Sequence, residues 1–181
     1  MKLDDVYNQT LRTLIYEESG DRVAILPGGF KPPHKGHFEA LKYIIDTYRC
    51  TSAIIYIGSG ERDGITAQQS LQIWKLYERH IGVPTEVLLA DVTPVKSVYE
   101  YTDENKHKEI FVGAGEEDQG RYAWFEKHKD EFGHVTVVPI PPQFGRISGS
   151  ATREKLQKGI IDFVPDDARE DEDKVAAILG L

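Results

Sequence analysis

Residues 28–37 read Gly-Gly-Phe-Lys-Pro-Pro-His-Lys-Gly-His, and this stretch, motif one, decides how the surrounding sequence is expected to fold. An apolar run at residues 23–26 precedes it, and apolar residues at helical spacing follow it over residues 38–48. Motif one is therefore predicted to be a loop between a buried strand and a helix that opens at Gly36 and His37. Glycine lets backbone N–H groups approach a ligand closely, and the free N–H groups at a helix start favour an anion. With its lysines and two histidines, this loop is typical of a site that holds a phosphate group.

Short apolar runs alternate with helical patterns along the rest of the chain. The predicted strands are residues 23–26, 53–57, 86–90, 110–112 and 135–138. The predicted helices are residues 36–48, 67–81, a weaker one from residue 94, 121–129 and 151–158. Strands that alternate with helices indicate an α/β fold, here a Rossmann-like doubly wound parallel sheet of about five strands with flanking helices. Ligands bind such sheets beyond the carboxyl ends of the strands, so we expect the site at that edge.

The length of the chain fits a single domain that spans residues 1–181. Residues 1–20 are predicted to be a helical extension, because residues 3–17 carry an amphipathic helical pattern. Residues 166–181 begin with acidic residues and end in a second helical pattern. The sequence contains no internal repeat and no low-complexity segment.

Composition argues against several classes of protein. A net charge of −8 argues against nucleic-acid binding, which needs a basic surface. No apolar run approaches the ~18 residues that a membrane span needs, and the N-terminus lacks the features of a signal peptide. Because Cys50 is the single cysteine, we expect a reducing, cytoplasmic setting and a buried apolar role for this residue. Trp74 and Trp124 are expected to lie in the core.

Two segments carry a resemblance to a known family. Motif one resembles the Gly-x-Phe-x-Pro-x-His-x-Gly-His (HxGH) signature of the nucleotidyltransferase superfamily, whose core is Rossmann-like. Residues 147–153, Ile-Ser-Gly-Ser-Ala-Thr-Arg, are motif two, and they resemble the superfamily's second signature, Ile-Ser-Ser/Gly-Thr/Ser-x-x-Arg. The two motifs occur in the expected order, and the likeness covers about residues 22–165.

Within this superfamily, motif one looks most like that of the archaeal-type nicotinamide-nucleotide adenylyltransferases. Three positions depart from their pattern. Gly29 stands in place of an arginine, Lys31 replaces a polar residue and can restore the lost cation, and Ser150 replaces a threonine. Their loop with an aspartate and a tryptophan, which reads the nicotinamide, is poorly matched. The resemblance therefore specifies the reaction class better than it specifies the acceptor.

The resemblance implies transfer of AMP from ATP to a phosphate-bearing acceptor, with release of pyrophosphate and with nicotinamide or nicotinate mononucleotide as the first candidate acceptor. The residues implied in catalysis are His34, His37, Lys31 and Arg153. The residues implied in nucleotide binding are Gly28, Gly29, Phe30, Gly36, Ile147, Ser148 and Ser150. Gly113 and Asp118 are added because they follow the fourth predicted strand. Mg²⁺ is expected as a cofactor that binds through the phosphates, without protein ligands. A homo-oligomer is left open.

Other interpretations of these residues remain. His34 and His37, three positions apart, could share a zinc ion, although no third ligand lies nearby at ligand spacing. The glycines of residues 113–115 could form a plain turn, and Asp118 could belong to a solvated acidic loop. A different acceptor (phosphopantetheine, FMN, glycerol phosphate or a sugar phosphate), CTP in place of ATP, and a non-catalytic nucleotide-binding protein all stay open.

Overall fold

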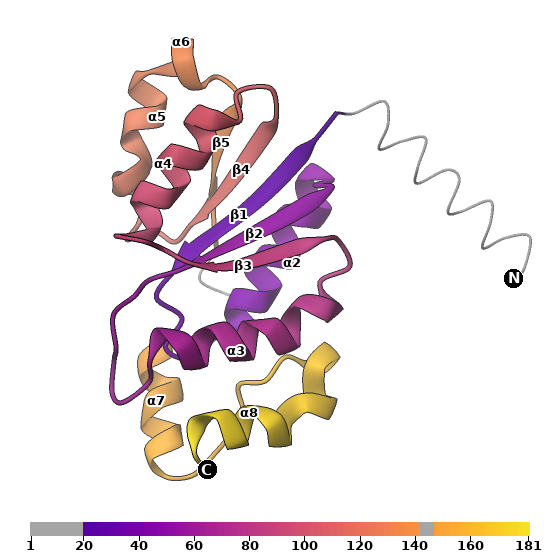
Figure 1. Ribbon diagram of the computed structural model, residues 1–181, viewed down its shortest axis with the longest axis vertical. Coiled ribbons are helices and arrows are strands. Elements are labelled where there is room, and N and C mark those ends of the chain that lie inside the picture. The colour runs from indigo at the N-terminus through magenta and orange to yellow at the C-terminus, as the bar shows by residue number, and fades with distance from the viewer. Residues whose placement is uncertain (1–19, 142–146) are drawn as a thin grey trace, which may run out of the picture.

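The computed structural model describes residues 20–141 and 147–181, which form a five-stranded, all-parallel sheet with the strand order β3-β2-β1-β4-β5 (Figure 1). The strands are β1 (Arg22–Gly28), β2 (Ser52–Ile57), β3 (Thr85–Leu89), β4 (Glu109–Ala114) and β5 (Val135–Pro139). The predicted α/β, Rossmann-like fold is confirmed. The chain leaves β1 toward β2 on one side and returns to β4 on the other, so the order reverses between β1 and β4.

Helices cover both faces of this sheet (Figure 1). Those on one face are α2 (Lys35–Tyr48), α3 (Ala67–Tyr77) and α8 (Glu172–Leu179), and those on the other are α4 (Pro94–Glu104), α5 (Ala123–Lys127) and α6 (Lys129–Phe132). Each face has its own cluster of buried apolar side chains, because the central strands carry apolar side chains on both faces of the sheet. Helix α7 (Gly149–Gln157) lies beside the amino end of α3, and a 3-10 segment, η4 (Asp166–Asp171), leads into α8.

The boundaries of several helices differ from the prediction. Helix α2 begins at Lys35 rather than at Gly36, because His34 is the residue that caps it. The single helix predicted over residues 121–129 is instead a 3-10 turn, η2 (Gln119–Tyr122), followed by α5 and α6, which are separated by the non-helical backbone of His128. The helix predicted over residues 67–81 ends at Tyr77 and continues as a short 3-10 turn, η1 (Glu78–His80). The predicted extension at residues 1–20 lies, apart from Gly20, outside the described residues.

The two tryptophans have different environments. Trp74 is fully buried between α3 and the sheet, as predicted. The prediction for Trp124 is wrong, because its side chain is 42% exposed and stacks on His128 at a ring-centroid distance of 3.9 Å. The neighbouring Phe125 occupies the core position of the short helix α5, which turns Trp124 outward. Cys50 is buried as expected, and burial raises the pKa of its thiol to about 12, which disfavours the reactive thiolate form.

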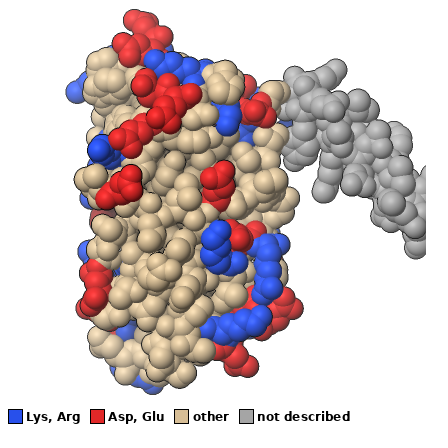
Figure 2. All heavy atoms as spheres, in the orientation of Figure 1, with Lys and Arg blue, Asp and Glu red and all other residues tan. Residues whose placement is uncertain are grey.

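On the face shown in Figure 2, Lys and Arg side chains gather toward the lower right, with acidic side chains beside them. Acidic and basic side chains alternate toward the end formed by α4, α5 and α6, while much of the centre carries neither. Within the described part of the chain, no helix has both the length and the apolar character needed to cross a membrane.

Candidate active site at the reversal of strand order

A cleft of about 1070 Å³ opens at the carboxyl ends of β1 and β4, where the strand order reverses. This is where parallel open sheets bind their ligands, because loops diverge there to opposite faces. The residues of motif one that line it are Gly28, Gly29, Phe30, Lys31, His34, Gly36 and His37. From elsewhere in the chain, the predicted residues Gly113, Asp118, Ile147, Ser148 and Arg153 line it as well. Ser150 is exposed and does not belong to this lining.

Contacts with the core hold the backbone of motif one in place. The buried ring of Phe30 meets the rings of His37 and Trp74 edge-on, at centroid distances of 4.8 and 5.4 Å. The hydroxyl of Ser70 in α3 donates a hydrogen bond to the Phe30 carbonyl oxygen. At Gly28, an added Cβ would lie 2.8 Å from the Phe30 ring, so only glycine fits there. The loop is thus shaped by packing before any ligand binds.

The two histidines form a stacked pair at the start of α2. Their ring centroids lie 3.6 Å apart, and the backbone N–H of His34 donates to Nδ1 of His37 at 3.2 Å. Because Nδ1 of His37 accepts a hydrogen bond, the neutral ring carries its proton on Nε2. His37 can therefore act as a hydrogen-bond donor through Nε2. Nδ1 of His34 is buried and has no hydrogen-bond partner among the described residues.

Both imidazoles are neutral at pH 7 in the free protein. Burial, together with the charges of Arg153 and Lys35, lowers the pKa of His34 to about 4. Burial and the neighbouring His34 hold the pKa of His37 well below its ordinary value. A polyanion in the cleft would favour the protonated forms and raise both pKa values.

Two N–H groups at the start of α2 are already paired inside the protein. The N–H of Lys35 donates to the carbonyl oxygen of Phe163 at 2.7 Å, and that of His34 is used by His37. The ammonium of Lys35 lies 3.3 Å from the Asp162 carbonyl oxygen, away from the cleft. The sequence suggested that Lys35 offers a cation to an anion, and that suggestion is wrong. The free N–H groups were expected at Gly36 and His37, and of these the N–H of His37 donates to the His34 carbonyl oxygen at 2.9 Å.

Lys31 joins the ends of two strands. Its ammonium donates to the carbonyl oxygens of Gly29 and, at 3.0 Å, of Gly58 after β2. Burial, followed by the nearby charge of Arg62, lowers the pKa of Lys31. Lys31 lines the cleft, but its donors are engaged with the backbone, so in this state it stabilises the loop.

Arg153 brings motif two to motif one. Its Nη1 donates to the Lys31 carbonyl oxygen at 3.1 Å, across 122 positions of sequence, and its Nε donates to Asp63 Oδ2 at 2.6 Å. Ser148 caps α7, because its hydroxyl oxygen accepts from the N–H of Ala151 at 3.2 Å. The guanidinium and the imidazole pair thus share one cleft, as the resemblance to the superfamily requires.

Gly113 and Asp118 have structural roles of their own. Gly113 lies inside β4, where an added Cβ would be 2.6 Å from Ile44 Cδ1, so close packing alone explains the glycine. Asp118 pairs with Arg121, Oδ1 to Nε at 3.3 Å, on the cleft rim, where Arg121 is exposed and Asp118 is half-buried. Their contact with a nucleotide stays a prediction.

Several cleft residues were missed from the sequence. The loop after β2 contributes Glu61 and Arg62, the start of α4 contributes Thr93, and η2 contributes Arg121. These residues belong to no motif. The one available signal was Asp63-Gly64, a dipeptide that favours a tight two-residue turn.

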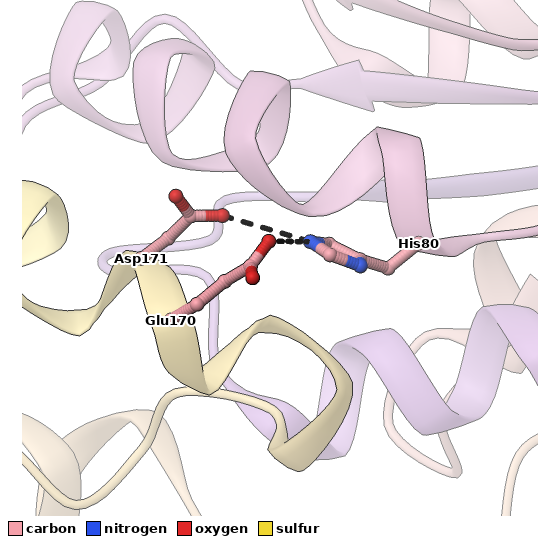
Figure 3. A group of neighbouring side chains, drawn as sticks. All are labelled: His80, Glu170 and Asp171. Atoms are coloured by element: carbon pink, nitrogen blue, oxygen red, sulfur yellow. Dashed lines mark ion pairs between the residues drawn. The ribbon is translucent and has the colours of Figure 1, made fainter.

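A group of potential metal ligands lies outside the cleft. Among residues 20–141 and 147–181, the one cluster of three is His80, Glu170 and Asp171, where η4 meets η1 (Figure 3). Nε2 of His80 lies 3.6 Å from Asp171 and 3.9 Å from Glu170. Burial would raise the pKa of Asp171, but hydrogen bonds from Arg79 and Lys174 lower it to about 2. Because two cations already compensate Asp171, the cluster anchors the C-terminal segment and is poorly suited to a metal.

Comparisons with known proteins show the fold. No protein-family model matches the sequence, and no curated protein matches it. Among solved structures, the chain is similar to a protein from Vibrio parahaemolyticus that is provisionally named a nicotinate-nucleotide adenylyltransferase, with a TM-score of 0.61 and 16% identity. That similarity covers 89% of this chain and 99% of the other. The two chains share the Rossmann-like arrangement over nearly their whole lengths.

Proposed function

We propose that the chain is a nucleotidyltransferase that transfers AMP from ATP to a phosphate-bearing acceptor, nicotinamide or nicotinate mononucleotide, and releases pyrophosphate. The observation that carries this proposal is the convergence of His34, His37 and Arg153 on one cleft at the reversal of strand order. The similarity of fold to a protein named for the same reaction class supports it.

The reaction needs positioning and charge stabilisation, and no covalent intermediate with the protein. An oxygen of the acceptor phosphate attacks the α-phosphorus of ATP in line, and the bond to the bridging oxygen of pyrophosphate breaks with both electrons leaving on that oxygen. Nε2–H of His37 would donate to a non-bridging oxygen of the α-phosphate, where negative charge must be stabilised. One preorganised donor of this kind contributes ~10²–10³-fold in rate.

Arg153 and Ser148 would hold the β- and γ-phosphates, as the resemblance implies. Each charge-assisted contact contributes ~1.5–3 kcal/mol, and the start of α7 adds a smaller, favourable dipole. When Mg²⁺ is bound through phosphate oxygens, it supplies further neutralisation of the triphosphate.

The proposal is tested by incubating the protein with Mg-ATP and each candidate acceptor, followed by pyrophosphate release and product mass. The panel includes both mononucleotides, phosphopantetheine, FMN, glycerol phosphate and sugar phosphates, with a parallel arm of CTP. We expect pyrophosphate only when the correct acceptor is present. ATP binding without turnover on any acceptor would instead indicate a non-catalytic nucleotide-binding protein.

A further inference from the structure

The loop between β2 and α3 contains a tight turn beside the cleft. The N–H of Arg62 donates to the Ile65 carbonyl oxygen at 3.1 Å, and the N–H of Ile65 donates to the Arg62 carbonyl oxygen at 3.0 Å. Between them, Asp63 and Gly64 have φ angles of 51° and 79°. Two successive left-handed residues closed by a pair of cross-bonds are a compact, rigid reversal of the chain. The turn therefore holds the carboxylate of Asp63 on a fixed backbone.

That carboxylate is one of two groups that fix the guanidinium of Arg153. Nε of Arg153 donates to Oδ2 of Asp63, and Nη1 donates to the Lys31 carbonyl oxygen. A guanidinium has five N–H donors in a rigid plane. Two bonds from different atoms fix that plane, and the remaining donors are available to a ligand in the cleft that Arg153 lines.

We propose that Asp63 is a positioning residue of the nucleotide site, whose carboxylate holds Arg153 in the orientation in which it binds the β- and γ-phosphates. This inference rests on the proposed function. The turn itself accepts Asp at this position, because Asp-Gly is a preferred pair for two left-handed residues, so the role of Asp63 is inferred from its bond to Arg153.

The opposite effect, in which Asp63 competes with the nucleotide for Arg153, is disfavoured by the geometry. The Asp63 carboxylate engages Nε alone, and its side chain is 50% exposed, while the Arg153 side chain is 13% exposed. A triphosphate brings several charges and can form charge-assisted bonds with the donors that remain. Asp63 therefore orients Arg153 without blocking it.

Three variants separate the carboxylate from the turn. Asp63→Gly removes the carboxylate and keeps the left-handed backbone, which glycine adopts without strain. Asp63→Asn keeps that backbone and one acceptor oxygen but removes the charge. Arg49→Gly is the matched control, because Arg49 is an exposed residue with a φ of 52° at the end of α2, outside the cleft lining.

Calorimetry with Mg-ATP and steady-state kinetics measure the effects. We expect Asp63→Gly to weaken ATP binding ~10-fold, which corresponds to ~1.4 kcal/mol, because Arg153 must then be ordered on binding. Asp63→Asn should weaken it by ~3-fold, and Arg49→Gly should leave it unchanged. The KM for ATP should rise in parallel while the KM for the acceptor stays constant. In an Arg153→Ala background, Asp63→Gly should have no further effect.

Each remaining outcome decides against the inference. Unchanged or tighter ATP binding by Asp63→Gly would mean that the carboxylate is neutral or inhibitory. A loss that persists in the Arg153→Ala background would mean that Asp63 acts independently of Arg153. Failure of the proposed function is visible separately, because the wild-type protein would then release no pyrophosphate from Mg-ATP with any acceptor.

Discussion

Motif one and motif two face the same cleft, but they are held there in different ways. Motif one is packed into the protein, with Phe30 and His34 buried. The Ser70 hydroxyl donates to the Phe30 carbonyl oxygen, and the Gly58 carbonyl oxygen accepts from the Lys31 ammonium. Motif two is solvated: Ser148 and Ser150 are exposed, and α7 buries only Thr152. Arg153 provides the main link between motif two and the packed loop.

This difference predicts different consequences of mutation. A change in motif one alters groups that were shaped together with the core, so it should affect the chemical step and the stability. A change in motif two alters groups that rest on few contacts, so it should affect nucleotide binding and leave the fold intact. Four predictions test this division.

His37→Ala is expected to have the largest effect, a loss of turnover of at least ~100-fold, because it removes a donor that acts on the charge at the α-phosphate. Circular dichroism should show an intact fold. His107→Ala is the matched control, because His107 is exposed between α4 and β4. Near-normal turnover in His37→Ala would show that motif one does not act on the chemical step. The proposed division of roles between the two motifs would then be wrong.

Acidification should destabilise the protein through motif one. An unfolded histidine titrates near 6.5, while burial lowers the pKa of His34 to about 4. Between these values the unfolded chain binds a proton that the folded chain does not. The contribution of His34 to the folding stability is therefore fully present above pH 6.5 and is progressively lost as the pH falls toward 4. From pH 6.5 to 5 we expect a loss of ~2 kcal/mol from His34.

Urea melts at pH 7 and pH 5 measure this loss. His34→Asn should flatten the dependence, since Asn does not titrate and is a favourable residue at the N-cap position of a helix. Asp171 does not interfere, because its lowered pKa of about 2 affects stability only below pH 4. An equal pH dependence in wild type and His34→Asn would show that the buried pair does not control stability.

The strand pattern and the two motifs allowed the fold and the meeting of distant segments to be predicted, because both follow from local periodicity and short-range chemistry. The details of the site were not predictable in the same way. That Lys31 donates to Gly58, and that Phe163 pairs with the N–H of Lys35, depends on segments that meet only after folding. The wrong prediction for Trp124 has the same origin, because apolar character does not say which of two adjacent aromatic residues faces the core.

Arg153→Ala should weaken ATP binding by ~30-fold, since it removes charge-assisted contacts worth ~1.5–3 kcal/mol, while acceptor binding changes little. Circular dichroism should show an intact fold, with a modest fall in melting temperature, because the side chain is 13% exposed and its bonds to Asp63 and Lys31 are lost. Calorimetric titrations with ATP and with the acceptor measure the two affinities. Equal weakening of both would mean that motif two does not act on the nucleotide alone.

Ser148→Ala should have the smallest effect, because the side chain is exposed and has two separable tasks. As the cap of α7 it accepts from the N–H of Ala151, and its removal costs ~0.5–1 kcal/mol of stability. As a phosphate ligand its loss should weaken ATP binding ~3-fold. Ser148→Asp separates the tasks, because Asp caps a helix as well as Ser does but repels a phosphate. Stability should therefore recover in Ser148→Asp while ATP binding falls further. Recovery of both would assign Ser148 to the helix alone and would leave Arg153 as the residue through which motif two binds the nucleotide.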